Sequence, residues 1–96
     1  MLSGKQKRYL RSLGQEMEPI LFIGKDEITP NVIKQAQEAL KARELIKGRV
    51  LQNCAEAPEN IANQIAEALQ AELVQILGRN FLLYKRNQEK QRIVLP

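Results

Sequence analysis

Histidine is absent from this chain of 96 residues, and cysteine occurs only once, at Cys54. Histidine is the commonest general base and the commonest metal ligand, so both kinds of site lack their usual residue. A single cysteine allows neither an internal disulfide nor a paired-cysteine zinc site. The sequence also contains no nucleophile elbow and no Walker loop. We therefore expect no enzymatic activity, no metal, no cofactor and no small-molecule substrate.

Long hydrophobic runs are also missing. Apolar runs such as residues 20–23 and 73–77 are far shorter than the roughly 20 residues that a membrane span requires, and no signal peptide is recognisable. We expect a cytoplasmic protein that does not associate with membranes. With 44% hydrophobic and 27% charged residues, the chain has the composition of an ordinary globular protein. Its length favours one domain over residues 1–96.

The positive charge is concentrated at the two ends of the chain. Residues 1–11 contain four bases and no acid, and residues 79–96 contain five bases and one acid. The segment between them, residues 12–78, has six bases and ten acids, so the net charge of +4 comes from the ends. This distribution favours a polyanionic partner.

Capping residues and hydrophobic periodicity predict the secondary structure. Ser3 and Gln6 form a capping-box pattern, and Thr29 precedes a proline that favours the first turn of a helix. Residues 19–23 form an unbroken apolar run, which is typical of a strand buried on both faces. The expected elements are helices over 4–13, 30–42 and 58–71 and strands over 19–23, 44–51, 73–77 and 81–84.

The order α-β-α-β-α-β-β predicts a single compact α/β domain. Helices between strands imply some parallel pairing, and turn residues 78–80 predict that the last two strands form an antiparallel hairpin. We therefore expect a four-stranded mixed sheet with helices packed on it. Residues 93–95 either dock on this core or add a short edge strand.

Several basic side chains are candidate phosphate contacts. On the first helix, Tyr9, Leu10 and Leu13 share one arc, which we expect to pack, and the bases lie opposite. Lys47 shares a strand face with Arg49, and further bases flank the hairpin. Gly24 and Lys25 precede a helix N-terminus that favours anions, although Asp26 and Glu27 already supply negative charge there. Phe81 and Tyr84 either stack on bases or, as we favour, belong to the core.

The chain resembles the YhbY family, bacterial stand-alone versions of the CRM (chloroplast RNA splicing and ribosome maturation) domain. The resemblance spans essentially the whole chain and depends on the order and spacing of several short motifs. These motifs are Ser3-Gly4-Lys5-Gln6-Lys7 with Leu10 and Leu13, Pro19 with the apolar run to Gly24, Ile28-Thr29, Glu44-Leu45-Ile46-Lys47, Val74-Gln75-Ile76-Leu77-Gly78 and Leu83-Tyr84-Lys85.

The resemblance implies a fold similar to the C-terminal domain of translation initiation factor three. It also implies RNA binding, association with precursors of the large ribosomal subunit, and no catalysis or cofactor. Family members usually carry a Gly-x-x-Gly loop, of which this chain keeps Gly24 and replaces the second glycine with Glu27. Glutamate lacks the backbone freedom of glycine and repels phosphate, which puts the contribution of this loop in doubt.

The leading hypothesis is a ribosome assembly factor that binds ribosomal RNA in pre-ribosomal particles. The alternative is a protein-interaction module that binds a ribosomal protein or an assembly GTPase. The residues expected to contact RNA are Lys5, Lys7, Arg8, Arg11, Gly24, Lys25, Lys47, Arg49, Arg79, Lys85 and Arg86.

Overall fold

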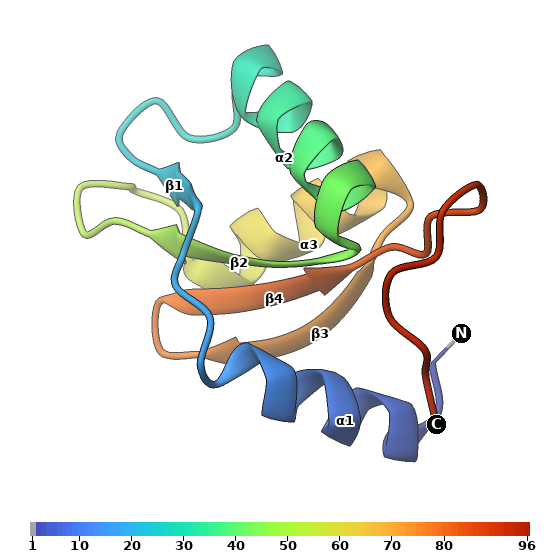
Figure 1. Ribbon diagram of the computed structural model, residues 1–96. Coiled ribbons are helices and arrows are strands. Elements are labelled where there is room, and N and C mark those ends of the chain that lie inside the picture. The colour runs from blue at the N-terminus through green and yellow to red at the C-terminus, as the bar shows by residue number, and fades with distance from the viewer. Residues whose placement is uncertain (1) are drawn as a thin grey trace.

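The computed structural model describes residues 2–96. Within them the predicted order of helices and strands is confirmed (Figure 1). No helix in this range combines the length and hydrophobicity that crossing a membrane would require. The elements are α1 (Gly4–Gly14), β1 (Leu21–Ile23), α2 (Pro30–Arg43), β2 (Leu45–Val50), α3 (Pro58–Leu69), β3 (Glu72–Leu77) and β4 (Asn80–Tyr84).

The four strands form one mixed sheet, as the pattern predicted, and their order in it is β1-β2-β4-β3. β1 runs parallel to β2, and the remaining neighbours are antiparallel. Helices α2 and α3 cover one face of this sheet, and α1 lies against the other face (Figure 1). The fold therefore has three layers, with the strands in the middle.

Local signals in the sequence account for the helix starts. The Ser3 hydroxyl accepts from the Gln6 N–H at 3.1 Å, and the Gln6 side chain accepts from the Ser3 N–H at 3.0 Å. The Thr29 hydroxyl accepts from the Val32 N–H at 3.2 Å, with Pro30 directly after it. Both caps satisfy backbone donors that have no partner within the helix.

Alternating side chains of the strands divide the core into two clusters. The larger cluster lies between the sheet and helices α2 and α3 and includes Ile46, Phe81 and Leu83. The smaller cluster lies on the α1 side and consists of Leu10, Leu45, Val74, Leu82 and Tyr84. Phe81 and Tyr84 are 1% and 4% exposed, so both belong to the core.

The expectation that the first strand is buried on both faces is wrong. The strand has only three residues, and while Leu21 and Ile23 are buried, Phe22 is 52% exposed. β1 is an edge strand, and its side chains alternate between the two faces of the sheet. Helices cover the face that holds Leu21 and Ile23, whereas the face that holds Phe22 stays open at this edge.

The orientation of α1 also differs from the expected apolar arc. Leu10 is fully buried, but Tyr9 and Leu13 are 38% and 36% exposed. Gly14 is buried instead, because its backbone lies against Leu82, whose side chain occupies the position that a Cβ would take. This close approach turns the helix so that Leu10 and Gly14 face the sheet, and Lys7 and Arg11 flank the contact as half-buried side chains.

The C-terminal segment docks and does not add a strand. Ile93 and Leu95 pack against the smaller cluster together with Leu2, while Val94 points outward with 80% of its surface exposed. The segment lies across the open end of the α1 layer, beside the first residues that the structure describes (Figure 1). Of the two alternatives for residues 93–95, docking is confirmed.

Candidate nucleic-acid interface

The two ends of the chain contact each other near the start of α1. The Gln6 side chain donates to the Pro96 carbonyl at 3.3 Å, a contact between residues 90 positions apart. Leu2 packs in the same cluster as Ile93 and Leu95. These contacts bring residues 93–96, the last four of the C-terminal tail (residues 85–96), against α1, whereas the tail bases precede them at residues 85–92.

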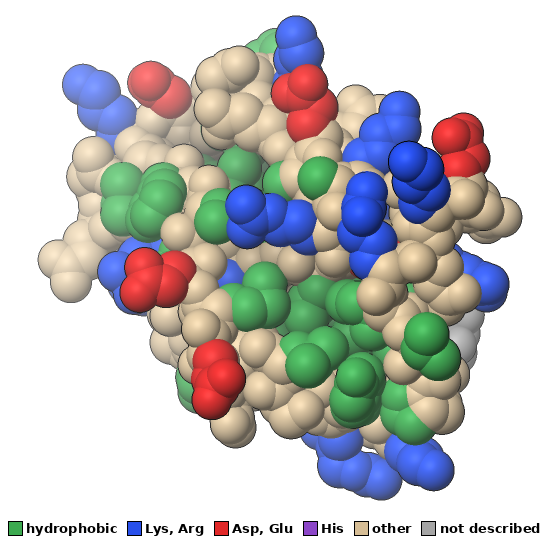
Figure 2. All heavy atoms as spheres, viewed as in Figure 1, with side chains coloured by type: hydrophobic (Ala, Val, Ile, Leu, Met, Phe, Trp, Pro, Cys, Tyr) green, Lys and Arg blue, Asp and Glu red, His purple; other side chains and the backbone are tan. Residues whose placement is uncertain are grey.

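Helix α1 presents its cations to solvent. Lys5 and Arg8 are exposed, and Lys7 and Arg11 lie half-buried at the border with the sheet. Figure 2 shows Lys and Arg side chains along the edge where α1 lies and hydrophobic side chains gathered between α1 and the sheet. Helix α1 itself contributes four bases and no acid to this surface.

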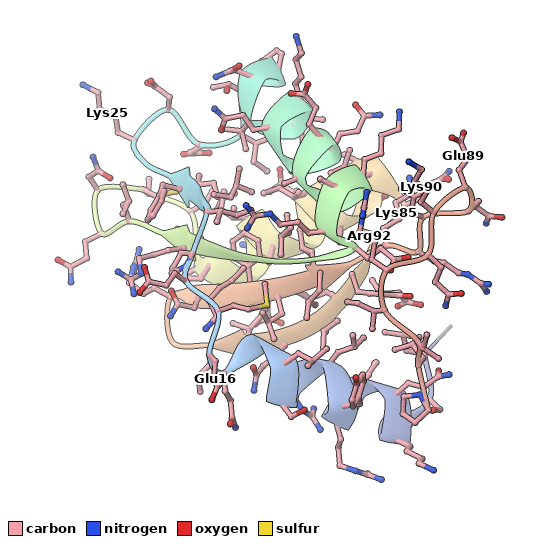
Figure 3. All side chains as sticks on the ribbon, in the orientation of Figure 1. Glu16, Lys25, Lys85, Glu89, Lys90 and Arg92 are labelled. Carbon is pink, nitrogen blue, oxygen red and sulfur yellow. The ribbon has the colours of Figure 1, made fainter. Side chains whose placement is uncertain are left out.

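Further bases lie in the tail beside the C-terminal end of α2. Figure 3 shows Lys85, Lys90 and Arg92 close together there, with Glu89 at the outer tip of the loop. The Lys85 ammonium donates to the Leu69 carbonyl at 2.7 Å, which also neutralises the negative end of α3. Both Lys85 and Arg86 are exposed, but the Lys85 ammonium already holds one hydrogen bond within the fold.

A buried carboxylate holds the tail in place. Glu44, which has no exposed surface, ends α2 and accepts from the N–H groups of Asn87 at 2.7 Å and of Arg92 and Ile93 at 2.6 Å each. Burial by itself would raise the pKa of Glu44, but these three donors and the nearby charge of Arg86 outweigh it and lower the pKa. The ionised carboxylate therefore fixes the course of the basic tail, a role that sequence patterns did not indicate.

A pocket of about 240 Å³ opens next to this anchor. It lies between the ends of α2 and α3 and the first residues of the tail. Its lining combines apolar and basic side chains. The lining residues are Gln37, Leu40, Lys41, Leu69, Lys85, Arg86, Asn87, Gln88 and Glu89.

The loop at Gly24 lies far from the tail. Figure 3 places Lys25 at the opposite end of the molecule from Lys85 and Arg92. The Glu27 N–H donates to the Gly24 carbonyl at 3.0 Å, and Glu27 has a φ of 56°. The loop thus keeps the left-handed backbone that a glycine would favour, with a glutamate in its place.

Lys47 and Arg49 share one face of β2, as predicted. They lie opposite Leu82 and Asn80 on β4, and the Arg49 Nε donates to the Asn80 side-chain oxygen at 3.0 Å. This face is the α1 side of the sheet. Arg79 differs, because its guanidinium donates to the Val50 and Leu51 carbonyls at 2.7 and 2.8 Å and so ties the hairpin turn to β2.

The predicted site residues therefore fall into separate groups. The α1 bases lie on the helix itself, the tail bases lie beside the C-terminal end of α2 (Figure 3), and the pair on β2 lies on the α1 side of the sheet. Gly24 and Lys25 stand apart from the tail. The sequence did not predict that Phe22 is exposed. It lies in a run of apolar residues, where nothing distinguishes an exposed side chain at a sheet edge from its buried neighbours.

Known proteins match the chain over nearly its whole length. The model of the CRS1 / YhbY (CRM) domain matches residues 2–85. YqeI of Bacillus subtilis, which is named as an RNA-binding protein, is 47% identical over all of both chains. An RNA-binding protein of Haemophilus influenzae is 35% identical over 99% of this chain and 95% of its own length.

A solved structure agrees with the fold. The solution structure of a Staphylococcus aureus protein described as a candidate for RNA binding superimposes with a TM-score of 0.82. That protein is 47% identical to this chain, and the match covers all of both chains. With a matching family model, close relatives and a shared fold, the chain belongs to the CRS1 / YhbY (CRM) domain family.

Proposed function

We propose that this protein binds ribosomal RNA in precursors of the large ribosomal subunit and acts as a non-enzymatic assembly factor. The observation that carries the proposal is the course of the C-terminal segment, which leads from the tail bases beside α2 to α1, where the Gln6 side chain donates to the Pro96 carbonyl (Figure 3). Phosphates of a folded RNA can span the α1 surface and the tail, and each contact releases condensed counterions. The protein then holds an RNA region in an arrangement that allows assembly to continue.

Two further features support binding to RNA over binding to a protein. The relatives from Bacillus subtilis and Haemophilus influenzae are named as RNA-binding proteins. Helix α1 carries bases and no acid, whereas protein interfaces are usually depleted of lysine. The link to the large subunit comes from the family resemblance.

The first test measures affinity for ribosomal RNA fragments against salt concentration. Log affinity is expected to fall by about 0.7 to 0.9 per tenfold rise in salt for each phosphate contacted. Arg8→Glu should weaken binding and reduce this slope. Lys34→Glu, which makes the same charge change at an exposed position on α2, is the matched control.

The second test identifies the RNA. Crosslinking in cells followed by sequencing of the attached RNA should recover segments of large-subunit ribosomal RNA. Affinity that does not depend on salt, or crosslinks spread over unrelated transcripts, would contradict the proposal. Retention of a ribosomal protein or GTPase partner by an Arg8→Glu variant that has lost RNA would favour an interaction module.

A further inference from the structure

One row of side chains crosses the entire sheet on its α1 face. Phe22 on β1 is in register with Arg49 on β2, Arg49 with Asn80 on β4, and Asn80 with Leu77 on β3. Residues in register on adjacent strands point to the same face. These four side chains therefore form one continuous strip, which we call the open row.

Helix α1 stops short of the open row. Its last residue, Gly14, packs on Leu82, which lies two positions along β4 from Asn80 and so one step away on the same face. Phe22 and Leu77, at the two ends of the row, are 52% and 68% exposed, and Arg49 is also exposed. The row is thus a part of the sheet that no element within residues 2–96 covers.

Two bases, Arg49 and Lys47, lie on this part of the sheet. Arg49 is held by Asn80 through its Nε, so its two terminal nitrogens remain available as donors. Lys47 lies one step along β2 toward α1, in register with Leu82, which faces Gln75 on β3. Neither the open row nor this neighbouring row contains an acid. Between them lies a recess of about 30 Å³.

We infer that the open row binds an unpaired RNA base, which stacks on the Phe22 ring while Arg49 and Lys47 contact the adjoining phosphates. Exposed aromatic rings on sheet surfaces are the usual platforms for unpaired bases, and nearby cations hold the backbone. Phe22 lies on an edge strand, so a nucleotide can approach the ring from the side. Neighbouring strands are about 4.8 Å apart, which places ring and guanidinium within reach of one nucleotide.

The position of the row connects it to the rest of the site. β1 ends one residue after Phe22, and exposed Lys25 follows Gly24 in the next loop. Lys25 is therefore a further exposed cation within three residues of Phe22 in the chain. The inference extends the proposed function, because it names single-stranded RNA as the form recognised at this part of the surface.

The test uses the full chain and an oligouridine of about ten nucleotides, followed by fluorescence anisotropy. Phe22→Ala should reduce affinity between about fivefold and about a hundredfold, and Phe22→Tyr should restore most of it. Leu77→Ala is the matched control, since it removes an even more exposed side chain from the same row without removing a ring. Thermal unfolding of each variant checks that the fold is kept.

A second readout reports stacking directly. The chain has no tryptophan and two tyrosines, so a Phe22→Trp variant carries a single tryptophan, which can be excited selectively, in the open row. Adding the oligouridine should quench its fluorescence, and a fully paired RNA duplex should quench it much less. Bound oligonucleotide without quenching, or equal affinity of Phe22→Ala and the parent protein, would overturn the inference.

The two proposals fail in different ways. If Phe22→Ala binds oligouridine normally while Arg8→Glu still weakens binding to ribosomal RNA, the inference about the open row is wrong and the proposed function stands. If Phe22→Ala loses a protein partner and keeps its RNA affinity, the row serves that protein and the inference is wrong. If the parent protein binds neither RNA, both proposals are wrong.

Discussion

The Glu44 carboxylate accepts a 2.6 Å hydrogen bond from the backbone N–H of Arg92, 48 residues further along the chain. This bond joins the end of α2 to the tail, and the same carboxylate also accepts from Asn87 and Ile93. A buried anion with three N–H donors behaves like an internal cap for a segment without secondary structure. The arrangement positions the tail bases in the proposed interface.

Replacing Glu44 with glutamine should release the tail. The amide keeps one acceptor oxygen but presents an NH2 group where a second acceptor is needed, which leaves buried donors unpaired. We expect a loss of about 1 to 3 kcal/mol in the free energy of unfolding, measured by urea denaturation. Amide exchange at Asn87, Arg92 and Ile93 should quicken. Glu89→Gln, at an exposed position, is the control and should change neither quantity.

Acid should weaken the same contact. The pKa of Glu44 is lower in the folded protein than in the unfolded chain, because the backbone donors favour the ionised carboxylate. Its contribution to stability is therefore fully present above the unfolded pKa and is lost as the pH falls through the folded pKa. Nuclear magnetic resonance of the Arg92 and Ile93 amides should follow this titration. The Glu44→Gln variant should lack it, and an identical acid response in that variant would contradict the assignment.

Gly14→Ala should disturb the docking of α1. An added methyl group would overlap the Leu82 side chain, so the helix must shift or Leu82 must change rotamer. Overpacking of this kind typically costs about 1 to 3 kcal/mol. The control is Gly4→Ala, where the added methyl meets only the Arg8 guanidinium at 3.8 Å. A Leu82→Ala background should reduce the cost of Gly14→Ala, as a double-mutant cycle would measure.

Glu27→Gly should stabilise the loop and strengthen RNA binding. Glu27 has a φ of 56°, a conformation that costs most residues about 1 to 2 kcal/mol and glycine little. Removing its charge also takes away repulsion of phosphate. Glu27→Gln separates the two effects, because it removes the charge but keeps the strained backbone. We expect glycine to raise stability and glutamine not to, and we expect RNA affinity to rise in both variants.

Local chemistry in the sequence determined the order of elements and where the helices begin. Ser3, Thr29 and Pro58 act through neighbouring backbone groups, and the change from helical to alternating periodicity marks the strands, so contacts between distant residues are not needed to recognise them. The concentration of bases at the two ends is likewise a property of the sequence.

Only the tertiary structure decided which of these side chains are available. The exposure of Phe22 depends on where α1 ends over the sheet, and that position depends on the fit of Gly14 against Leu82. Arg79 and Lys85 donate to backbone carbonyls, and Glu44 accepts from backbone N–H groups of the tail. These hydrogen bonds join residues 16 to 49 positions apart in the chain. Such contacts depend on packing between elements, which no local pattern encodes. The sequence therefore showed which residues are basic, and only the tertiary structure showed which of these side chains are free to contact a partner.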